Sequence, residues 1–186
     1  METISDNALM FKVKEGDLEK LGLLFERYKK MLFTFFYRMN FDESLSEDLV
    51  QNVFVRIMKY RHTFRGDGEF RMWMFHIARN VNHEHFRRGG RMGKQVELNS
   101  RHDQLSDHHS HAVVNDIEHD LSLLTIAMSR LEPEKKEILT LSKIEGMKYR
   151  DIAEMLNITE GSVKIKVFRA LKDLRVTFRK IKMSHG

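Results

Sequence analysis

The chain has 186 residues, of which 41% are hydrophobic and 10% aromatic, enough to build one ordinary core or two small ones. Its formal charge of +5 and its pI of about 9.4 favour a polyanionic partner without identifying it. Cysteine is absent, which excludes disulfides and thiolate metal sites and fits a reducing cytoplasm.

The N-terminal stretch METISDNALMFKVKEGD lacks the apolar core of a signal peptide. No run in the chain approaches the roughly 18 apolar residues that a membrane span requires. We therefore expect a soluble, intracellular protein with no direct membrane insertion.

Apolar residues recur at helical spacing in the first half of the chain. Ser44 or Ser46 stands ahead of Glu47 and Asp48, which predicts an N-cap for the second helix. The apolar runs cover residues 21–36 and 49–58, and a third helix is predicted over residues 70–88.

Charge is distributed in blocks along the chain. Lys and Arg outnumber Asp and Glu by eight to three in residues 61–94 and by eleven to five in residues 143–182, whereas acids lead by six to one in residues 95–120. The stretch 87–111 has little hydrophobic periodicity and is rich in Gly, Ser, His and Asp, the composition of a solvated linker. We place a first domain at 1–90, a flexible acidic linker at 91–116 and a second domain at 117–186.

The second domain begins with a predicted helix over residues 117–131. Pro133 suits the first turn of the next helix, which continues to 144 and stops at Gly146. No strand pattern of useful length and no internal repeat is present. The predicted fold is all-α, with two small helical domains joined by a flexible linker and a helix-turn-helix in the C-terminal one.

That helix-turn-helix is YRDIAEMLNITEGSVKIKVFRALKDL, residues 149–174. Ala153 is small enough for close helix approach, Leu156-Asn157-Ile158 forms the turn, and Thr159 is a suitable N-cap. The second helix should bury Val163, Val167, Ala170, Leu171 and Leu174.

The opposite face of the second helix carries Ser, Lys and Arg. A basic outer face is often only a solvated surface. Here the turn spacing, the small residue and the cap coincide, which favours a recognition helix that enters a major groove.

LEPEKKEILTLSKIEGMKYRDIAEMLNITEGSVKIKVFRALKDLR, residues 131–175, resembles the C-terminal promoter-binding domain of bacterial sigma factors. SEDLVQNVFVRIMKY, residues 46–60, is similar to the helix that docks on the clamp of the RNA polymerase largest subunit. FRMWMFHIARNVNHEHFRR, residues 70–88, is similar to the helix that opens and reads the promoter. The two-domain layout resembles the extracytoplasmic-function (ECF) group of the sigma-70 family. The resemblance covers about residues 21–88 and 117–179.

The resemblance implies that the recognition helix binds the minus-35 element. Many relatives carry Arg where Lys166 stands, and Lys cannot reproduce the bidentate fork that Arg offers guanine, so the sequence preference is expected to differ. Base-facing residues would be Ser162, Ile165, Lys166 and Arg169, and phosphate contacts would come from Lys164, Lys172 and Arg175.

By the same resemblance, the loop 61–69 and the helix after it would hold the melted minus-10 strand. An unstacked base needs a pocket, an aromatic surface, amides and cations. Phe64 and Asn80 are the pocket candidates, whereas the spacing of Trp73 favours a core role over base contact. Glu84 stands where relatives usually carry Asp. The whole minus-10 set is Phe64, Trp73, Arg79, Asn80, His83, Arg87 and Arg88.

The resemblance implies that the predicted helix over residues 46–60 docks on RNA polymerase. Phe54 is also expected to be half core, and Asp48 also fits a simple helix-start acid. The docking set is Asp48, Gln51, Asn52, Phe54, Val55 and Arg56.

These assignments imply a sigma factor of the ECF type in the bacterial cytoplasm. It would bind core RNA polymerase and promoter DNA and direct transcription initiation. An anti-sigma factor would cover its polymerase-binding surfaces. The acidic linker would thread toward the RNA exit path or serve as a plain solvated spacer.

The sequence also offers two rival hypotheses. A zinc site could form from His102, Asp107, His108, His109 and His111, but this set lacks a helical framework, so we expect no metal. With no catalytic triad, phosphate loop or paired carboxylates, we expect no enzyme activity and no cofactor. A stand-alone helix-turn-helix regulator would usually dimerise and has no need of residues 46–60 and 70–88.

Overall fold

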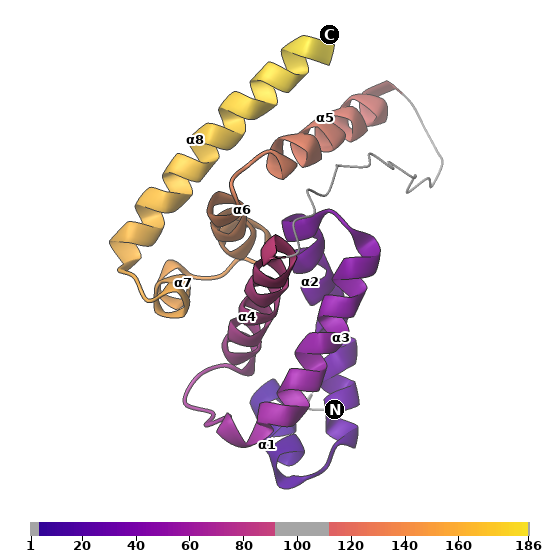
Figure 1. Cartoon of the computed structure of the whole chain (residues 1–186), viewed down its shortest axis with the longest axis vertical. Helices are drawn as coiled ribbons and strands as arrows, with labels where there is room; N and C mark the ends of the chain where they lie inside the picture. Colours follow the sequence, from indigo (N-terminus) through magenta and orange to yellow (C-terminus); the bar gives the residue numbers. More distant parts are fainter. Residues whose placement is uncertain (1–3, 92–111, 186) are drawn as a thin grey trace.

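Figure 1 shows the computed structural model, which describes residues 4–91 and 112–185. Regular structure in these two ranges is entirely helical, which confirms the predicted all-α class. The first half contains α1 (Asp6–Glu15), α2 (Glu19–Asn40), α3 (Glu43–Tyr60), the 3₁₀ turn η1 (Arg61–Thr63) and α4 (Phe70–Arg91). The second half contains α5 (Ala112–Ser129), α6 (Pro133–Leu139), the π-helical turn η2 (Thr140–Ile144), α7 (Tyr149–Leu156) and α8 (Glu160–His185).

Helices α2, α3 and α4 form the predicted N-terminal bundle. Their apolar positions at helical spacing meet in the interior, where each side chain is removed from water and stabilises the fold by roughly 1.5–3 kcal/mol. Fully buried residues of this core include Leu32, Phe35, Phe36, Val53, Ile57, Met74 and Phe75.

Helix α1 was not predicted from the sequence. Ser5 caps it by accepting a hydrogen bond from the Ala8 amide, and Gly16 ends it in the left-handed region at φ 111°. Its buried residues are Leu9, Met10 and Val13, which pack on the bundle. The short apolar stripe among charged residues gave too weak a periodic signal.

The predicted cap of α3 was wrong. Asp42 is the N-cap, and its carboxylate accepts a 2.9 Å hydrogen bond from the Leu45 amide. Ser46 is instead fully buried, and its hydroxyl donates back to the Asp42 carbonyl. The helix therefore begins earlier than the serines indicated, because the carboxylate of Asp42 already satisfies its first amides.

The second half follows the predicted order of helices. Pro133 occupies the first turn of α6, and Gly146 follows η2 with φ 63°. Asn157 ends α7 in the left-handed region, and Thr159 caps α8 by accepting a 3.1 Å hydrogen bond from the Ser162 amide. Helix α5 begins at Ala112, within the segment assigned to the linker, and residues 92–111 of that segment lie outside the described residues.

The buried face of α8 differs from the prediction at one position. Val163, Val167 and Ala170 are buried, but Leu171 is 36% exposed. The first turns of α8 pack on α6 and α7, whereas its later turns pack on α5. Because the packing partner changes along the helix, its buried face moves to Leu174, Phe178 and Ile181.

The two halves pack against each other in this arrangement. Helix α2 contacts α5 and α6, and α4 contacts α7 (Figure 1). Buried side chains from both halves belong to one continuous apolar cluster. Arg79 and His83 of α4, which were assigned to DNA, therefore face the C-terminal half.

Candidate nucleic-acid interface

Helix α8 presents its basic face to solvent. Lys164, Lys166 and Arg169 are exposed, and the Ile165 side chain between them is 52% exposed. Ser162 is half-buried because its hydroxyl lies 2.8 Å from that of its capping residue, Thr159. Lys172 and Arg175 continue the exposed face. The Thr159 cap and the inward Val163 fix the rotation of α8, so that six of the seven predicted residues are exposed and Ser162 is half-buried.

Two ion pairs lie beside this face. Lys166 Nζ is 3.6 Å from the Glu134 carboxylate, and Lys135 Nζ is 2.9 Å from Asp173. All four side chains are at least one-third exposed, so solvent weakens the pairs and a phosphate can displace Glu134 from Lys166 at little cost.

The 61–69 loop closes over an aromatic cluster. Phe64 is 2% exposed, with its ring centroid 5.4 Å from both Phe11 and Trp73. In this arrangement the Phe64 ring packs beneath the loop, and neither face of the ring is open to a base. Trp73 is half-buried at the edge of the cluster, in line with the favoured core role.

An open pocket of about 600 Å³ lies between this loop and α7. Trp73 and His76 line it from α4, and Arg65 lines it from the loop. Arg150 and Asp151 of α7 form the facing wall. The pocket thus has an aromatic surface and cations, two of the groups that hold an unstacked base. Four carboxylates also line it, those of Asp67, Glu69, Asp151 and Glu154.

Cations of α4 contact buried carboxylates of the C-terminal half. Arg79 Nε donates to Glu137 over 3.0 Å, and His83 Nε2 lies 3.4 Å from the same carboxylate. Arg71 lies 3.7 Å from the Glu145 carboxylate and also donates to the Glu145 carbonyl. Both glutamate side chains are less than one-tenth exposed. They occupy positions where a phosphate would satisfy the same cations.

The rest of the predicted minus-10 set is open to solvent. Asn80, Arg87 and Arg88 are exposed on α4. The structure therefore separates the set into three accessible residues, two that face Glu137, and two aromatic residues in the cluster under the loop.

Burial shifts the pKa of ionisable groups between the halves, Glu145 and Lys136 among them. Burial raises the pKa of Glu145 to about 7, and the nearby Arg71 opposes that rise. Burial also lowers the pKa of Lys136, whose ammonium lies 5.1 Å from the centre of the Phe41 ring and 3.4 Å from the Met39 carbonyl. Removing the charged form of either side chain from water costs free energy, and the neighbouring groups offset only part of that cost.

The predicted docking helix, α3, is accessible along most of its assigned residues. Asp48, Gln51 and Asn52 are exposed, and Val55 is 58% exposed. Phe54 is buried at 7% exposure against Phe25. It therefore contributes to the core, as its spacing also indicated.

Arg56 is half-buried and joins α3 to α4. Its guanidinium donates two hydrogen bonds of 2.8 and 2.7 Å to Glu84 and a third to Asn52. The bond from Arg56 holds the pKa of Glu84 down at about 2. Glu84 thus takes part in a fork-shaped pair between the two helices.

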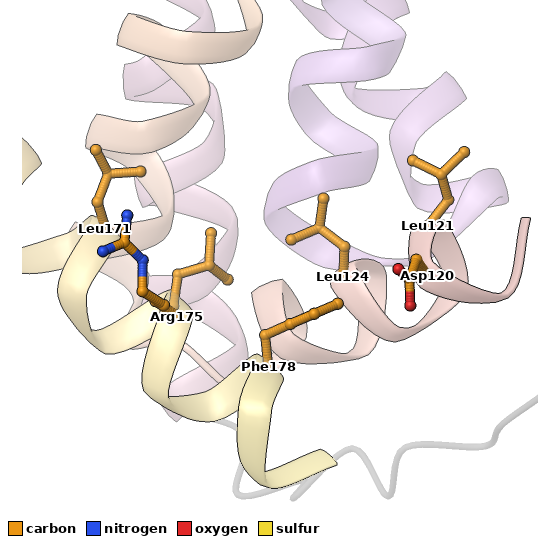
Figure 2. A pocket seen from close by; sticks show the side chains of 7 residues that line it. Asp120, Leu121, Leu124, Leu171, Arg175 and Phe178 are labelled. Atoms are coloured by element: carbon orange, nitrogen blue, oxygen red, sulfur yellow. The ribbon is translucent and has the colours of Figure 1, made fainter. Parts of the chain in front are cut away.

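An apolar groove of about 470 Å³ runs between α5 and α8 (Figure 2). Leu121 and Leu124 face Leu171 and Phe178 across it, and Asp120 and Arg175 lie at its edges. Leu121 is 57% exposed. This groove explains why Leu171 has an apolar side chain at an exposed position of α8.

Two family matches cover most of the chain. Residues 24–92 match Sigma-70 region 2, and residues 122–174 match Sigma-70 region 4. The chain belongs to the sigma-70 family of RNA polymerase sigma factors. This sigma factor is 26% identical over 178 residues to the ECF RNA polymerase sigma-E factor of Haemophilus influenzae, covering 91% of this chain and 93% of the relative. It is 27% identical over 161 residues to the ECF sigma factor SigX of Bacillus subtilis, with 84% and 82% covered.

These relatives place the sigma factor in the ECF group, as the sequence indicated. It is a transcription initiation factor that binds core RNA polymerase and directs it to promoters. A stand-alone helix-turn-helix regulator is not favoured, because the region 2 match accounts for α2 to α4.

Two solved structures share the fold. CnrH in complex with the cytosolic domain of CnrY has a TM-score of 0.68 at 22% identity, covering 94% of this chain and 97% of that one. RpoE in complex with the anti-sigma factor NepR from Bartonella quintana has a TM-score of 0.70 at 22% identity, with 85% and 96% covered.

Two further expectations concern metals and membranes. The histidine and aspartate set weighed as a zinc site, His102 to His111, lies outside the described residues. Within the described ranges, no helix is both long and apolar enough to cross a bilayer.

No sequence pattern indicated the acidic partners of α4. Glu137 and Glu145 sit in a helical pattern that looks solvent-exposed, and only the packing of the two halves buries them. Helix α1 had a usable signal in Ser5 and Gly16, a cap and a stop that flank its ten residues.

Proposed function

We propose that the sigma factor divides promoter recognition between its halves as the sequence indicated, with a first domain over 1–90, a linker over 91–116 and a second domain over 117–186. The exposed basic face of α8 would read the minus-35 element. The 61–69 loop and α4 would hold the melted minus-10 strand. The observation that carries this proposal is the capped recognition helix, on which six of the seven assigned residues are exposed.

Polymerase docking would use the exposed side of α3. Asp48, Gln51, Asn52 and Val55 are all accessible there, and of the four Asn52 also accepts a hydrogen bond from Arg56. Arg56 would act mainly by holding α3 to α4, because its guanidinium is already engaged with Glu84.

Binding of the melted strand would require the two halves to separate. Arg79 and His83 cannot contact a phosphate while Glu137 occupies them. The open pocket beside Trp73 is also walled by α7. Promoter DNA and the C-terminal half therefore compete for the same face of α4.

We propose no catalysis by this chain alone and no cofactor, since RNA synthesis belongs to the polymerase. Its place of action would be the bacterial cytoplasm, where polymerase and promoter DNA are found. RpoE of Bartonella quintana was solved with an anti-sigma factor. A partner of that kind would control this sigma factor by covering the exposed side of α3.

The experiment that tests the proposal is promoter-dependent transcription by purified core polymerase, with and without the sigma factor, across a promoter library. Specific starts that need the sigma factor support the proposal and define both promoter elements. If the protein bound DNA alone, formed no complex with core polymerase and initiated nothing, the proposal would fail.

A further inference from the structure

The unpredicted helix α1 lies against the loop that leads into α4. Asn7 Nδ2 donates a 2.9 Å hydrogen bond to the Gly68 carbonyl, and the Phe70 amide donates a 2.7 Å hydrogen bond to Asn7 Oδ1. One side-chain amide thus binds the end of the loop and the first residue of α4 together. Amides at the start of a helix lack partners within the helix, so Asn7 acts as a cap supplied from another part of the chain.

A second residue of α1 holds the start of the same loop. Lys14 Nζ donates a 2.7 Å hydrogen bond to the Phe64 carbonyl. The Phe11 ring packs edge-on against the Phe64 ring at 5.4 Å. Helix α1 therefore contacts the loop through side chains spaced along its whole length.

The loop between these contacts is intrinsically pliable. Gly66 adopts φ 75°, and a Cβ at this position would overlap the Phe11 ring. Gly66 and Gly68 both lack a side chain that would restrict the backbone, so a free loop would lose much conformational entropy on binding a base. Contacts that fix the loop beforehand lower that cost.

Helix α1 is itself firmly anchored. Leu9, Met10 and Val13 are fully buried. Asp6 accepts hydrogen bonds from Arg27 and Tyr28 of α2. The restraint on the loop is thus connected to the core of the N-terminal bundle.

We propose that Asn7 and Lys14 are positioning residues that hold the 61–69 loop in the shape that receives the melted minus-10 strand. They act from behind the loop, on its backbone carbonyls and on the first amide of α4, and touch no DNA themselves. This inference rests on the proposed role of the loop.

The test uses the full chain bound to core polymerase and two DNA probes. One probe exposes a single-stranded minus-10 segment, and the other is duplex and carries only the minus-35 element. Affinity for each probe is measured together with the loss of affinity when a minus-10 base is replaced. Thermal unfolding of each free variant is recorded alongside.

Asn7→Ala should weaken binding to the melted probe about tenfold, the scale of one or two net hydrogen bonds, and should reduce discrimination between minus-10 bases. Binding to the minus-35 duplex should change less than about twofold, because α8 is untouched. Asn7→Asp keeps the acceptor for the Phe70 amide but cannot donate to Gly68, so it should recover part of the loss.

Lys14→Met should give the same selective loss, and Lys14→Arg should restore binding. Lys12→Met is the matched control, because Lys12 is exposed on the same helix. If Asn7→Ala lowers the folded fraction, the comparison of Lys14→Met with Lys14→Arg tests the inference instead. Equal losses on both probes, or unchanged discrimination, would overturn the inference. A wild-type complex with no preference for the melted minus-10 probe would instead show that the proposed role of the loop is wrong.

Discussion

Lys164 and Arg169 differ in the kind of DNA contact that their positions allow. Both are exposed on α8, but Arg169 carries a planar fork that can bind two acceptors of one guanine, whereas Lys164 offers a point charge on the flank. The same exposed helix can thus supply both specificity and general affinity.

We expect Arg169→Ala to cost about 1–3 kcal/mol on the best minus-35 sequence and to relax specificity at one base position. Lys164→Ala should weaken all sequences similarly and lower the salt dependence by about one phosphate contact. Binding across a library of minus-35 sequences at two salt concentrations measures both effects. Uniform loss from both variants would contradict the assignment of a base to Arg169.

The helices α3 and α4 are joined by the fork between Arg56 and Glu84. The exposed fractions of the two side chains are 22% and 32%, so water reaches the pair and screens it. Its contribution should therefore be smaller than that of a fully buried pair.

Arg56→Ala should lower the free energy of unfolding by about 1 kcal/mol, measured by urea titration. Because the folded pKa of Glu84 lies below its ordinary value, this stabilisation is present above about pH 4.5 and lost as the pH falls toward 2. Gln51→Ala is the control, since Gln51 is exposed on the same helix. It should weaken polymerase binding and leave unfolding unchanged. A stability loss from Gln51→Ala as large as that from Arg56→Ala would contradict this division of roles.

At the scale of the whole molecule, buried carboxylates hold the halves together. Glu137→Gln should weaken the closed arrangement by about 1–3 kcal/mol, because Arg79 and His83 lose their charged partner. The chain has no cysteine, so Lys30→Cys and Lys180→Cys give unique sites for fluorescent labels. In the free protein, energy transfer between the two labels should be lower with Glu137→Gln than without it. The matched control is Glu134→Gln, because Glu134 is an exposed glutamate on the same helix. An unchanged distance distribution with Glu137→Gln would contradict the prediction.

Glu145 makes the stability of this arrangement depend on pH. The folded chain keeps its carboxyl protonated up to about pH 7, whereas an unfolded chain releases the proton near 4.5. The folded state therefore binds more protons in this window and loses stability as the pH rises through it, by about 3 kcal/mol. Glu145→Gln should remove this slope in urea unfolding measured across the window. Exposed Glu132→Gln should retain it, and an unchanged slope in Glu145→Gln would show that another group is responsible.

Several local features could be predicted from the sequence because neighbouring residues determine them. Pro133 marks the first turn of α6, Asn157 the turn of the helix-turn-helix, and Thr159 the cap of α8. Each depends on hydrogen bonds or backbone angles within a few residues. The outer face of α8 follows from the same local periodicity.

The sequence by itself determined the helical class, the order of the main helices and the family, because periodicity, caps and motif spacing are local properties. Only the tertiary structure decided that Phe64 is enclosed, that Leu171 borders a groove and that Arg79 faces Glu137. The partners in these contacts come from helices far away in the chain. Burial and charge pairing depend on which helices meet, and no local pattern encodes that choice.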